Sequence, residues 1–181
     1  MKKSQKGFTI IEVALVLAIG ALIFLVVFLA VPALQRNQRN DARHRDVSNI
    51  VTAVSSWAAN NTQSNLATKA GTENQVDGTT GTGKQDSELG KYLDSVSSNT
   101  EEVVVKQYNE ANDTEAPDAD GVRKAKSSLY TKEGQPVKVT VVMGATCDGT
   151  TGLKAGAQRS AAVVGSTETT GDPEPYCSTA S

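Results

Sequence analysis

The sequence has little of what most enzymes and metal proteins need. It contains one histidine and two cysteines in 181 residues. No Ser–His–Asp arrangement can be built around His44, and neither a phosphate-binding glycine loop nor an HExxH pair occurs. The net charge of −2 gives no electrostatic reason to bind DNA or RNA. We therefore expect a non-enzymatic chain with no cofactor, no metal site and no specific nucleic-acid partner.

Charged side chains are also scarce after Lys6, since Glu12 is the only one between Lys6 and Arg36. Nearly every residue from Thr9 to Leu34 is apolar, and such a helix would be about 39 Å long, enough to cross a hydrocarbon core of ~30 Å. A carboxylate near the centre of a membrane helix costs roughly 2.5–3.5 kcal/mol. We therefore expect Glu12 to have an ionic partner or a functional role.

Three interpretations of this apolar segment compete. A cleaved secretory signal has a hydrophobic region of roughly 7–15 residues, and this run is about twice as long, although residues 30–33 faintly resemble a cleavage site. A plain single-span anchor fits the length but leaves Glu12 unexplained. The third interpretation depends on the residues around Gly7.

The segment KGFTIIEV, residues 6–13, resembles the class III signal sequence of type IV prepilins, in which a short basic leader ends in glycine. The resemblance implies that a prepilin peptidase removes residues 1–7 by cutting between Gly7 and Phe8. It also implies that the new amino group of Phe8 is N-methylated. Glu12 then occupies the fifth position after the cut, where the family keeps its glutamate. The resemblance covers only the amino-terminal part of the chain.

The physics of a buried charge agrees with this interpretation. In a filament the apolar segments bundle in a lipid-like core, where a lone carboxylate is unfavourable unless a cation is near. The amine of a neighbouring Phe8 is such a cation, and it exists only after the leader is removed. We therefore hypothesise that Glu12 couples cleavage to assembly.

The orientation of the segment is ambiguous by charge alone. Basic residues flank both of its ends: Lys2, Lys3 and Lys6 on one side, and Arg36, Arg39, Arg43 and Arg45 on the other. The family resemblance and the cysteines, which favour an exported domain, together predict a cytoplasmic amino terminus. The expected location is the inner or cytoplasmic membrane, and then a surface filament.

Beyond the apolar segment, assigned to residues 8–34, the helix is expected to continue as an amphipathic helix over residues 35–60. Apolar residues recur there at spacings of three and four: Val47, Ile50, Val51, Val54, Trp57 and Ala58. Pro32 predicts a kink, and Gly20 lowers helix propensity. Either both are tolerated as in ordinary membrane helices or, as the pilin family suggests, this stretch bends or unwinds on packing.

Residues 61–181 are expected to form a globular head. Its first part, residues 61–85, is rich in glycine and polar residues and predicts a flexible loop, followed by a short helix over residues 86–97. Strand-like segments follow at residues 102–108, 127–131, 137–143 and 161–164, with a hairpin turn at residues 132–136. The predicted fold is α+β: a long helix packed on a small antiparallel sheet, as in type IV pilins.

Cys147 and Cys177 are expected to form a disulfide if the domain is exported. The bridge would close a loop of about 31 residues, and it would stabilise the fold by roughly 3–4 kcal/mol. Many pilins also carry a disulfide near the carboxyl terminus.

Two charged clusters remain open to interpretation. The arginines at positions 36, 39, 43 and 45, with Asp41 and Asp46, form either a solvated face near lipid head groups or salt bridges between stacked subunits. Acidic residues gather over residues 113–120, where a calcium site is conceivable but a solvated loop is favoured.

The resemblance implies a structural subunit of a type IV pilus, whose fibre serves motility, adhesion or DNA uptake. The expected partners are other copies of the chain, prepilin peptidase, the assembly platform, other pilins and, before assembly, membrane lipid. The alternatives are a pseudopilin of a type II secretion or competence system and a membrane-anchored binding domain.

Overall fold

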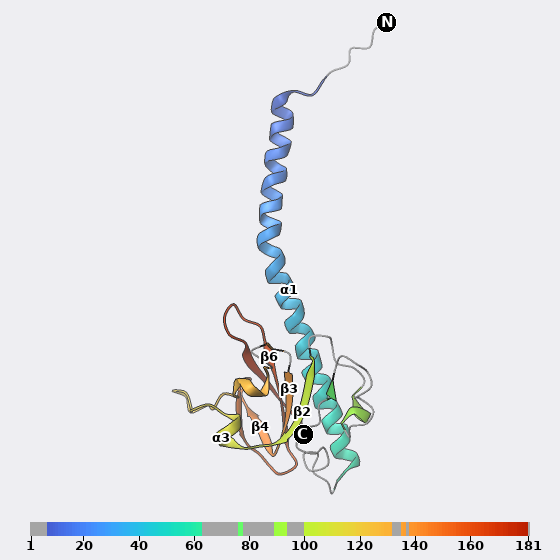
Figure 1. Cartoon of the computed structure of the whole chain (residues 1–181), viewed down its shortest axis with the longest axis vertical. Coiled ribbons are helices and arrows are strands. Elements are labelled where there is room, and N and C mark those ends of the chain that lie inside the picture. Colours follow the sequence, from blue (N-terminus) through green and yellow to red (C-terminus); the bar gives the residue numbers. More distant parts are fainter. Residues whose placement is uncertain are drawn as a thin grey trace. The chain divides into compact units, whose positions relative to one another are not determined.

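The structure is a computed structural model of the chain (Figure 1), and it describes residues 7–62, 76–77, 89–93, 100–131, 135–136 and 138–180. The chain divides after Gln38 into two compact units. One helix, α1, extends from Ile10 to Asn60 and contributes residues to both. The long helix expected from the sequence is therefore confirmed. Gly20 and Pro32 both lie within it, and a kink there stays a prediction.

The first unit consists of the apolar half of α1. Every large apolar side chain from Phe8 to Leu34 is between 40% and 91% exposed. By length and composition α1 is the one helix among the described residues that could cross a membrane. The large apolar side chains of this half of the helix are therefore exposed along its whole length.

The second unit is built on a five-stranded sheet with the order β1-β2-β3-β6-β7. Its strands are β1 (Val76–Asp77), β2 (Glu102–Gln107), β3 (Lys138–Met143), β6 (Ala161–Thr167) and β7 (Glu174–Ala180). All neighbouring strands are antiparallel except β2 and β3, which are parallel. The α+β class expected from the sequence is confirmed.

The amphipathic half of α1 packs on one face of this sheet. Val47, Ile50 and Trp57 are at most 1% exposed, and they lie in the same core cluster as alternate residues of the strands. The strand residues in that cluster include Val103, Val105, Val139, Val141 and Val163. Because successive strand residues point to opposite faces, this valine set marks the helix-facing side of the sheet.

A second layer covers the opposite face. It contains the hairpin of β4 (Ala145–Asp148) and β5 (Gly152–Ala155), extended by single bridges from Lys124 to Gly152 and from Thr114 to Ala125. The apolar residues between the two layers are Ala125, Leu129, Tyr130, Val142, Ala145, Leu153, Ala162, Val164 and Cys177. The sheet is therefore buried on both faces, between the helix and this layer.

A disulfide joins Cys147 in β4 to Cys177 in β7, with their Cα atoms 5.8 Å apart. The Cys177 N–H also donates a hydrogen bond to the Thr150 carbonyl at 2.7 Å. Unpaired N–H groups on an edge strand invite pairing with another chain. The β4–β5 hairpin therefore occupies part of the outer edge of β7.

The predicted hairpin between residues 127–131 and 137–143 is wrong. Ser127–Leu129 forms a 3₁₀ helix (η2), and β3 pairs instead with β2 and β6. Leu129 is 2% exposed, and its carbonyl accepts a hydrogen bond from Thr140 Oγ1 at 2.6 Å. The segment thus packs on a face of the sheet, because that placement buries Leu129 and Tyr130.

The sheet is antiparallel as expected, except that β2 and β3 are parallel. Parallel neighbours need a long connection, and here it contains the short helix α3 (Glu110–Asp113) and η2. Strands β4, β5 and β7 were not predicted from the sequence, and β6 continues to Thr167 although it was predicted to end at Val164.

Two expectations for residues 61–97 are corrected in part. Val76–Asp77 form a strand within the predicted loop, whereas most of residues 61–85 lie outside the described residues. In the predicted helix over residues 86–97, the described part is a single 3₁₀ turn (η1, Gly90–Tyr92), and Leu93 has an extended backbone. Leu89 and Leu93 are buried as their spacing suggested, but Gly90 between them favours a turn over a continuous helix.

The approach of β6 to α1 yields a test. A Cβ added at Gly165 would lie 2.6 Å from Val47 Cγ2, which is too close. We expect Gly165→Ala to destabilise the second unit by about 1–3 kcal/mol, measured by thermal unfolding of the detergent-solubilised chain. Val47→Ala should restore part of this loss in the double variant. Gly171→Ala, where the nearest atom is 4.0 Å away, is the matched control, and an equal loss there would contradict the steric cause.

Candidate functional site

The start of α1 is fixed by Thr9 and Glu12. The Thr9 N–H and hydroxyl both donate to Glu12 Oε2, at 2.9 and 2.8 Å, and the Glu12 N–H donates to Thr9 Oγ1 at 3.4 Å. This reciprocal arrangement is a capping box, with Thr9 as the N-cap and Glu12 at the third helical position. The Glu12 carboxylate therefore has hydrogen-bond partners within its own chain.

Thr9 is a functional candidate that the sequence reasoning missed. The pattern Thr-x-x-Glu directly before an apolar run is the usual signature of a capping box, so the signal was present. The prediction of an external cation depended on a Glu12 carboxylate without a partner in its own chain. In the structure, hydrogen bonds from Thr9 occupy part of the acceptor capacity of this carboxylate.

Gly7 and Phe8 lie outside the helix, directly before Thr9. Phe8 is 89% exposed, and among the described residues other than its chain neighbours no atom lies within 4 Å of the place where a Cβ on Gly7 would be. The peptide bond between these residues is therefore in an open, non-helical segment. A groove of about 280 Å³ follows it along the helix, and the described residues that line it are Phe8, Glu12, Val13, Val16 and Leu17, of which only Glu12 is charged.

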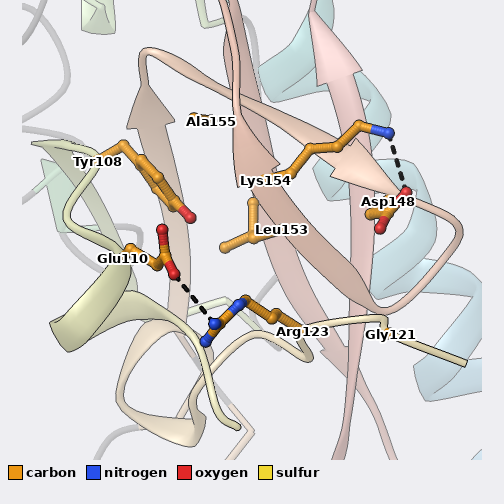
Figure 2. A pocket seen from close by; sticks show the side chains of 8 residues that line it. All are labelled: Tyr108, Glu110, Gly121, Arg123, Asp148, Leu153, Lys154 and Ala155. Carbon is orange, nitrogen blue, oxygen red and sulfur yellow. Dashed lines mark hydrogen bonds and ion pairs between the residues drawn. The ribbon is translucent and has the colours of Figure 1, made fainter. Parts of the chain in front are cut away.

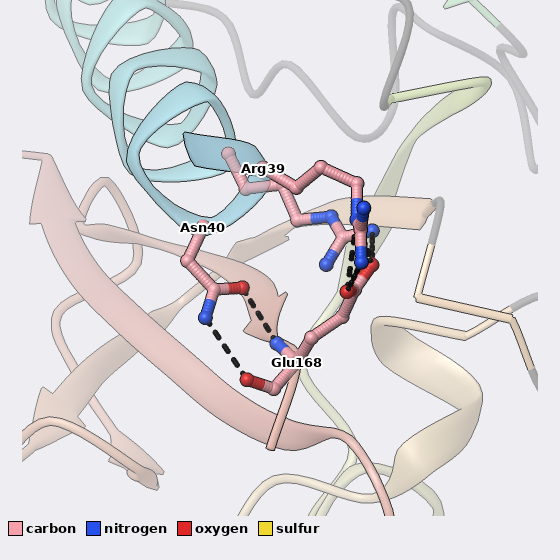
Figure 3. A network of polar contacts seen from close by, with 4 residues as sticks. Arg39, Asn40 and Glu168 are labelled. Carbon is pink, nitrogen blue, oxygen red and sulfur yellow. Dashed lines mark hydrogen bonds and ion pairs between the residues drawn. The ribbon is translucent and has the colours of Figure 1, made fainter. Parts of the chain in front are cut away.

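A second polar arrangement lies where the second unit begins. Glu168, just after β6, accepts hydrogen bonds from Arg39 Nε at 2.9 Å, Arg39 Nη2 at 2.7 Å and Arg43 Nη2 at 2.6 Å. Asn40 binds the backbone of the same residue, because its Nδ2 donates to the Glu168 carbonyl and its Oδ1 accepts from the Glu168 N–H. We call these four residues the helix–sheet clamp (Figure 3).

The clamp is partly buried, which strengthens its electrostatics. The side chains of Arg43 and Glu168 are 7% and 20% exposed. The hydrogen bonds from Arg39 lower the pKa of Glu168; burial raises it, and Arg43 lowers it further, with a net shift below the ordinary 4.5. Because both ends of the Glu168 residue are held, the loop after β6 is tied to α1 by its backbone as well as its charge.

The clamp corrects the interpretation of the arginine cluster. Neither head groups nor neighbouring subunits were needed to explain Arg39 and Arg43, since both pair with Glu168 in the same chain. Sequence could not show this, because the partner lies more than 120 residues away. The ring of His44 packs edge-on against that of Tyr176, with the ring centroids 4.0 Å apart.

In the acidic cluster at residues 113–120, Glu115, Asp118 and Asp120 are exposed, as the favoured solvated loop requires, but Asp113 is not. Asp113 is fully buried and pairs with Lys106 at 2.5 Å, and it accepts a hydrogen bond from the Asn109 N–H. Asp118 closes a turn by accepting hydrogen bonds from the N–H groups of Asp120 and Val122. In the described part of the chain no group of three or more potential ligands could hold a metal ion.

Arg159 is a further residue that the sequence did not reveal. Its Nη1 and Nη2 donate to the carbonyls of Thr62 and Ala58, at 2.8 and 2.9 Å. These contacts place a cation at the carboxyl end of α1, where unpaired carbonyls and the helix dipole favour it. Arg159 thus supplies the basic cap that the last turn of the helix lacks.

The clamp predicts a pH-dependent stability. Because the folded pKa of Glu168 is lowered, the unfolded chain binds the proton more tightly, and stability rises with pH. The contribution is complete above the ordinary pKa and is lost below about pH 4.5, as the pH falls through the folded pKa. Glu168→Gln should cost about 1–3 kcal/mol at pH 7.

Thermal unfolding at several pH values checks this prediction. The difference in melting temperature between the native chain and Glu168→Gln should shrink as the pH falls below 4.5. Taking a difference removes the contributions of other carboxylates. Glu115→Gln, at an exposed site, is the matched control and should change little. A gap that stays constant down to pH 3 would refute the role of the charge.

Comparison with known proteins bears on the amino-terminal segment. Residues 2–28 match the family model described as the prokaryotic N-terminal methylation motif. No curated protein and no solved structure matches the chain. The match covers Gly7, Phe8, Thr9 and Glu12, the residues whose geometry is described above. The chain therefore carries the type IV prepilin signature at residues 2–28, on an α+β fold of pilin-like architecture.

Proposed function

We propose that the chain is a structural subunit of a type IV pilus. It is stored as a single-pass prepilin in the inner or cytoplasmic membrane with its amino terminus in the cytoplasm. Prepilin peptidase cuts it between Gly7 and Phe8, and the Phe8 amine is methylated. The assembly platform then adds it to a filament of further copies and other pilins. Motility, adhesion or DNA uptake would belong to the fibre.

The observation that carries this proposal is the exposed apolar half of α1. Soluble monomers rarely expose apolar patches larger than a few hundred Å², yet every large apolar side chain from Phe8 to Leu34 is exposed. Such a surface needs lipid or other apolar helices around it. The prepilin signature on this segment supports both surroundings: lipid before assembly, and the apolar helices of neighbouring subunits afterwards.

In this assembly the Glu12 carboxylate would pair with a cation through the acceptor sites that its capping box does not use. A carboxylate has about four acceptor sites, and the Thr9 donors both go to Oε2. No basic residue lies between Phe8 and Leu34, so a cation in the filament core would have to come from a chain terminus. Cleavage after Gly7 supplies one, the amine of Phe8.

Two substitutions separate the charge from the cap. We expect Glu12→Ala to be cleaved and inserted into the membrane but to be absent from filaments, because it loses both. Glu12→Gln keeps an amide oxygen that can accept the Thr9 hydrogen bonds, but it cannot neutralise an amine. If the charge matters, Glu12→Gln should also be excluded. Filaments sheared from cells and immunoblotted against membranes measure this.

Thr9→Val is the matched control for the cap. It removes the hydroxyl with little change in size and leaves the charge of Glu12. The charge-pair role predicts that Thr9→Val assembles far better than Glu12→Gln. The reverse order would show that Glu12 serves only to start the helix, and normal piliation by Glu12→Ala would remove the residue from assembly altogether.

The mature amino terminus tests the processing step. Intact-mass measurement and amino-terminal sequencing should give a chain that begins at Phe8 with one added methyl group. A chain beginning at Met1 would indicate a plain anchor, and one beginning near Gln35 a secreted domain. Either result would contradict the proposal.

A pseudopilin of a type II secretion or competence system shares the same amino-terminal chemistry and is the second candidate. The prepilin signature supports both equally. Labelling surface filaments with an antibody to the second unit separates them, because a pilus subunit is displayed along long fibres. Unlabelled cells with normally processed protein would favour the pseudopilin.

A further inference from the structure

A pocket of about 220 Å³ opens on the second unit and shares no lining residue with the helix–sheet clamp (Figure 2). Three segments form it: the end of β2 with α3, the turn at residues 121–123, and the β4–β5 hairpin. The lining residues are Tyr108, Glu110, Gly121, Arg123, Asp148, Leu153, Lys154 and Ala155. Nothing in the proposed assembly uses this pocket.

Polar side chains form most of the lining of the pocket, with the half-buried Tyr108 ring among them. Leu153 is 1% exposed, and Figure 2 shows its side chain beside the Tyr108 ring. Two ion pairs flank them: Glu110 with Arg123 at 3.2 Å, and Asp148 with Lys154 at 2.9 Å. Burial, followed by the nearby Glu110 and Asp113 carboxylates, raises the pKa of Tyr108, so its hydroxyl stays a donor at neutral pH.

The charges of the rim are balanced. Two carboxylates face two cations, and each cation already has a partner within the pocket. A phosphate or a quaternary ammonium would therefore find no uncompensated charge to bind. A molecule with several hydroxyl groups can instead donate to Glu110 and Asp148 and accept from Arg123 and Lys154 without unbalancing either pair.

The walls of the pocket are held in place by backbone contacts. Leu153 N–H donates to the Arg123 carbonyl at 2.9 Å, and the Tyr108 N–H donates to the Met143 carbonyl at 2.9 Å. Asp148 follows Cys147, which the disulfide fixes to β7. A preformed site loses little conformational entropy on binding, which favours a weakly interacting ligand.

We propose that this pocket is a saccharide-binding site that takes one neutral hexose-sized ring at the end of a surface glycan. The Tyr108 ring contacts the C–H face of the sugar, and the two ion pairs hydrogen-bond its hydroxyl groups. The volume is below the roughly 300–1,000 Å³ of pockets for drug-sized ligands, so a single ring fits the site.

Binding by one site is weak, with a dissociation constant on the order of 1 mM, because its rim is open to water. Repetition along a filament would raise the avidity by roughly 10²–10⁴. Only this gain rests on the proposed function, since the pocket lies within one chain.

The test uses the full chain in a detergent without a sugar head group. Methyl glycosides of the gluco, galacto and manno configurations are titrated and followed by saturation-transfer NMR, with inorganic phosphate and glycylglycine as charged probes. We expect at least one glycoside to bind, and both charged probes to fail. Arg123→Met and Lys154→Met should each weaken binding about tenfold or more, and Tyr108→Leu should abolish it.

Arg45→Met, on the exposed side of α1, is the matched control and should bind like the native chain. Melting temperatures show whether each variant is folded, and Lys154→Met, at an exposed side chain, keeps the test valid if Arg123→Met unfolds. The proposal is overturned if no glycoside binds, if the Lys154 variant binds as well as the native chain, or if phosphate or the dipeptide binds in preference. Failure here would leave cleavage and filament assembly untouched, because the test uses unassembled protein.

Discussion

The burial of one face of α1 against the sheet is the interaction on which the rest of the structure depends. Val47, Ile50, Val54 and Trp57 fill the space between helix and strands, and the glycine at position 165 lets β6 approach that face closely. Without this layer the helix-facing valines of the sheet would be exposed to water. The other half of the same helix has exposed apolar side chains, so one continuous helix has one half suited to an apolar environment and one half suited to packing on the sheet in water.

The helix–sheet clamp coincides with the change between these two environments. The second unit begins at Arg39, the first residue of α1 that binds Glu168. Residues 8–34 have mainly apolar side chains suited to lipid or other helices, and residues after Arg39 have an apolar stripe suited to one sheet. The clamp is specific enough to mark that boundary. Glu168 binds two guanidinium groups through its carboxylate and Asn40 through its backbone, and each bond constrains direction as well as distance.

The helix and the prepilin signature could be predicted from the sequence because both depend on local patterns. The three- and four-residue spacing from Val47 to Trp57 predicted the buried stripe, and Trp57 is 1% exposed as expected for a core residue. The strand pairing could not be predicted in the same way. The parallel pairing of β2 with β3, the strand β7 and the ionic partners of Arg43 and Asp113 are set by contacts between distant segments. Thr9 is different, since its capping pattern was visible and was overlooked.

The disulfide changes which parts of the chain can carry tension. Cys147 and Cys177 enclose β5 and β6, and the cross-link offers a covalent path that bypasses both strands. A pull between α1 and the carboxyl terminus would pass from β4 directly to β7. The strand β6, which approaches α1 closely at Gly165, would therefore stay unstretched until the sulfur–sulfur bond breaks, whereas the central strand β3 lies outside the cross-linked loop, in the loaded part of the chain.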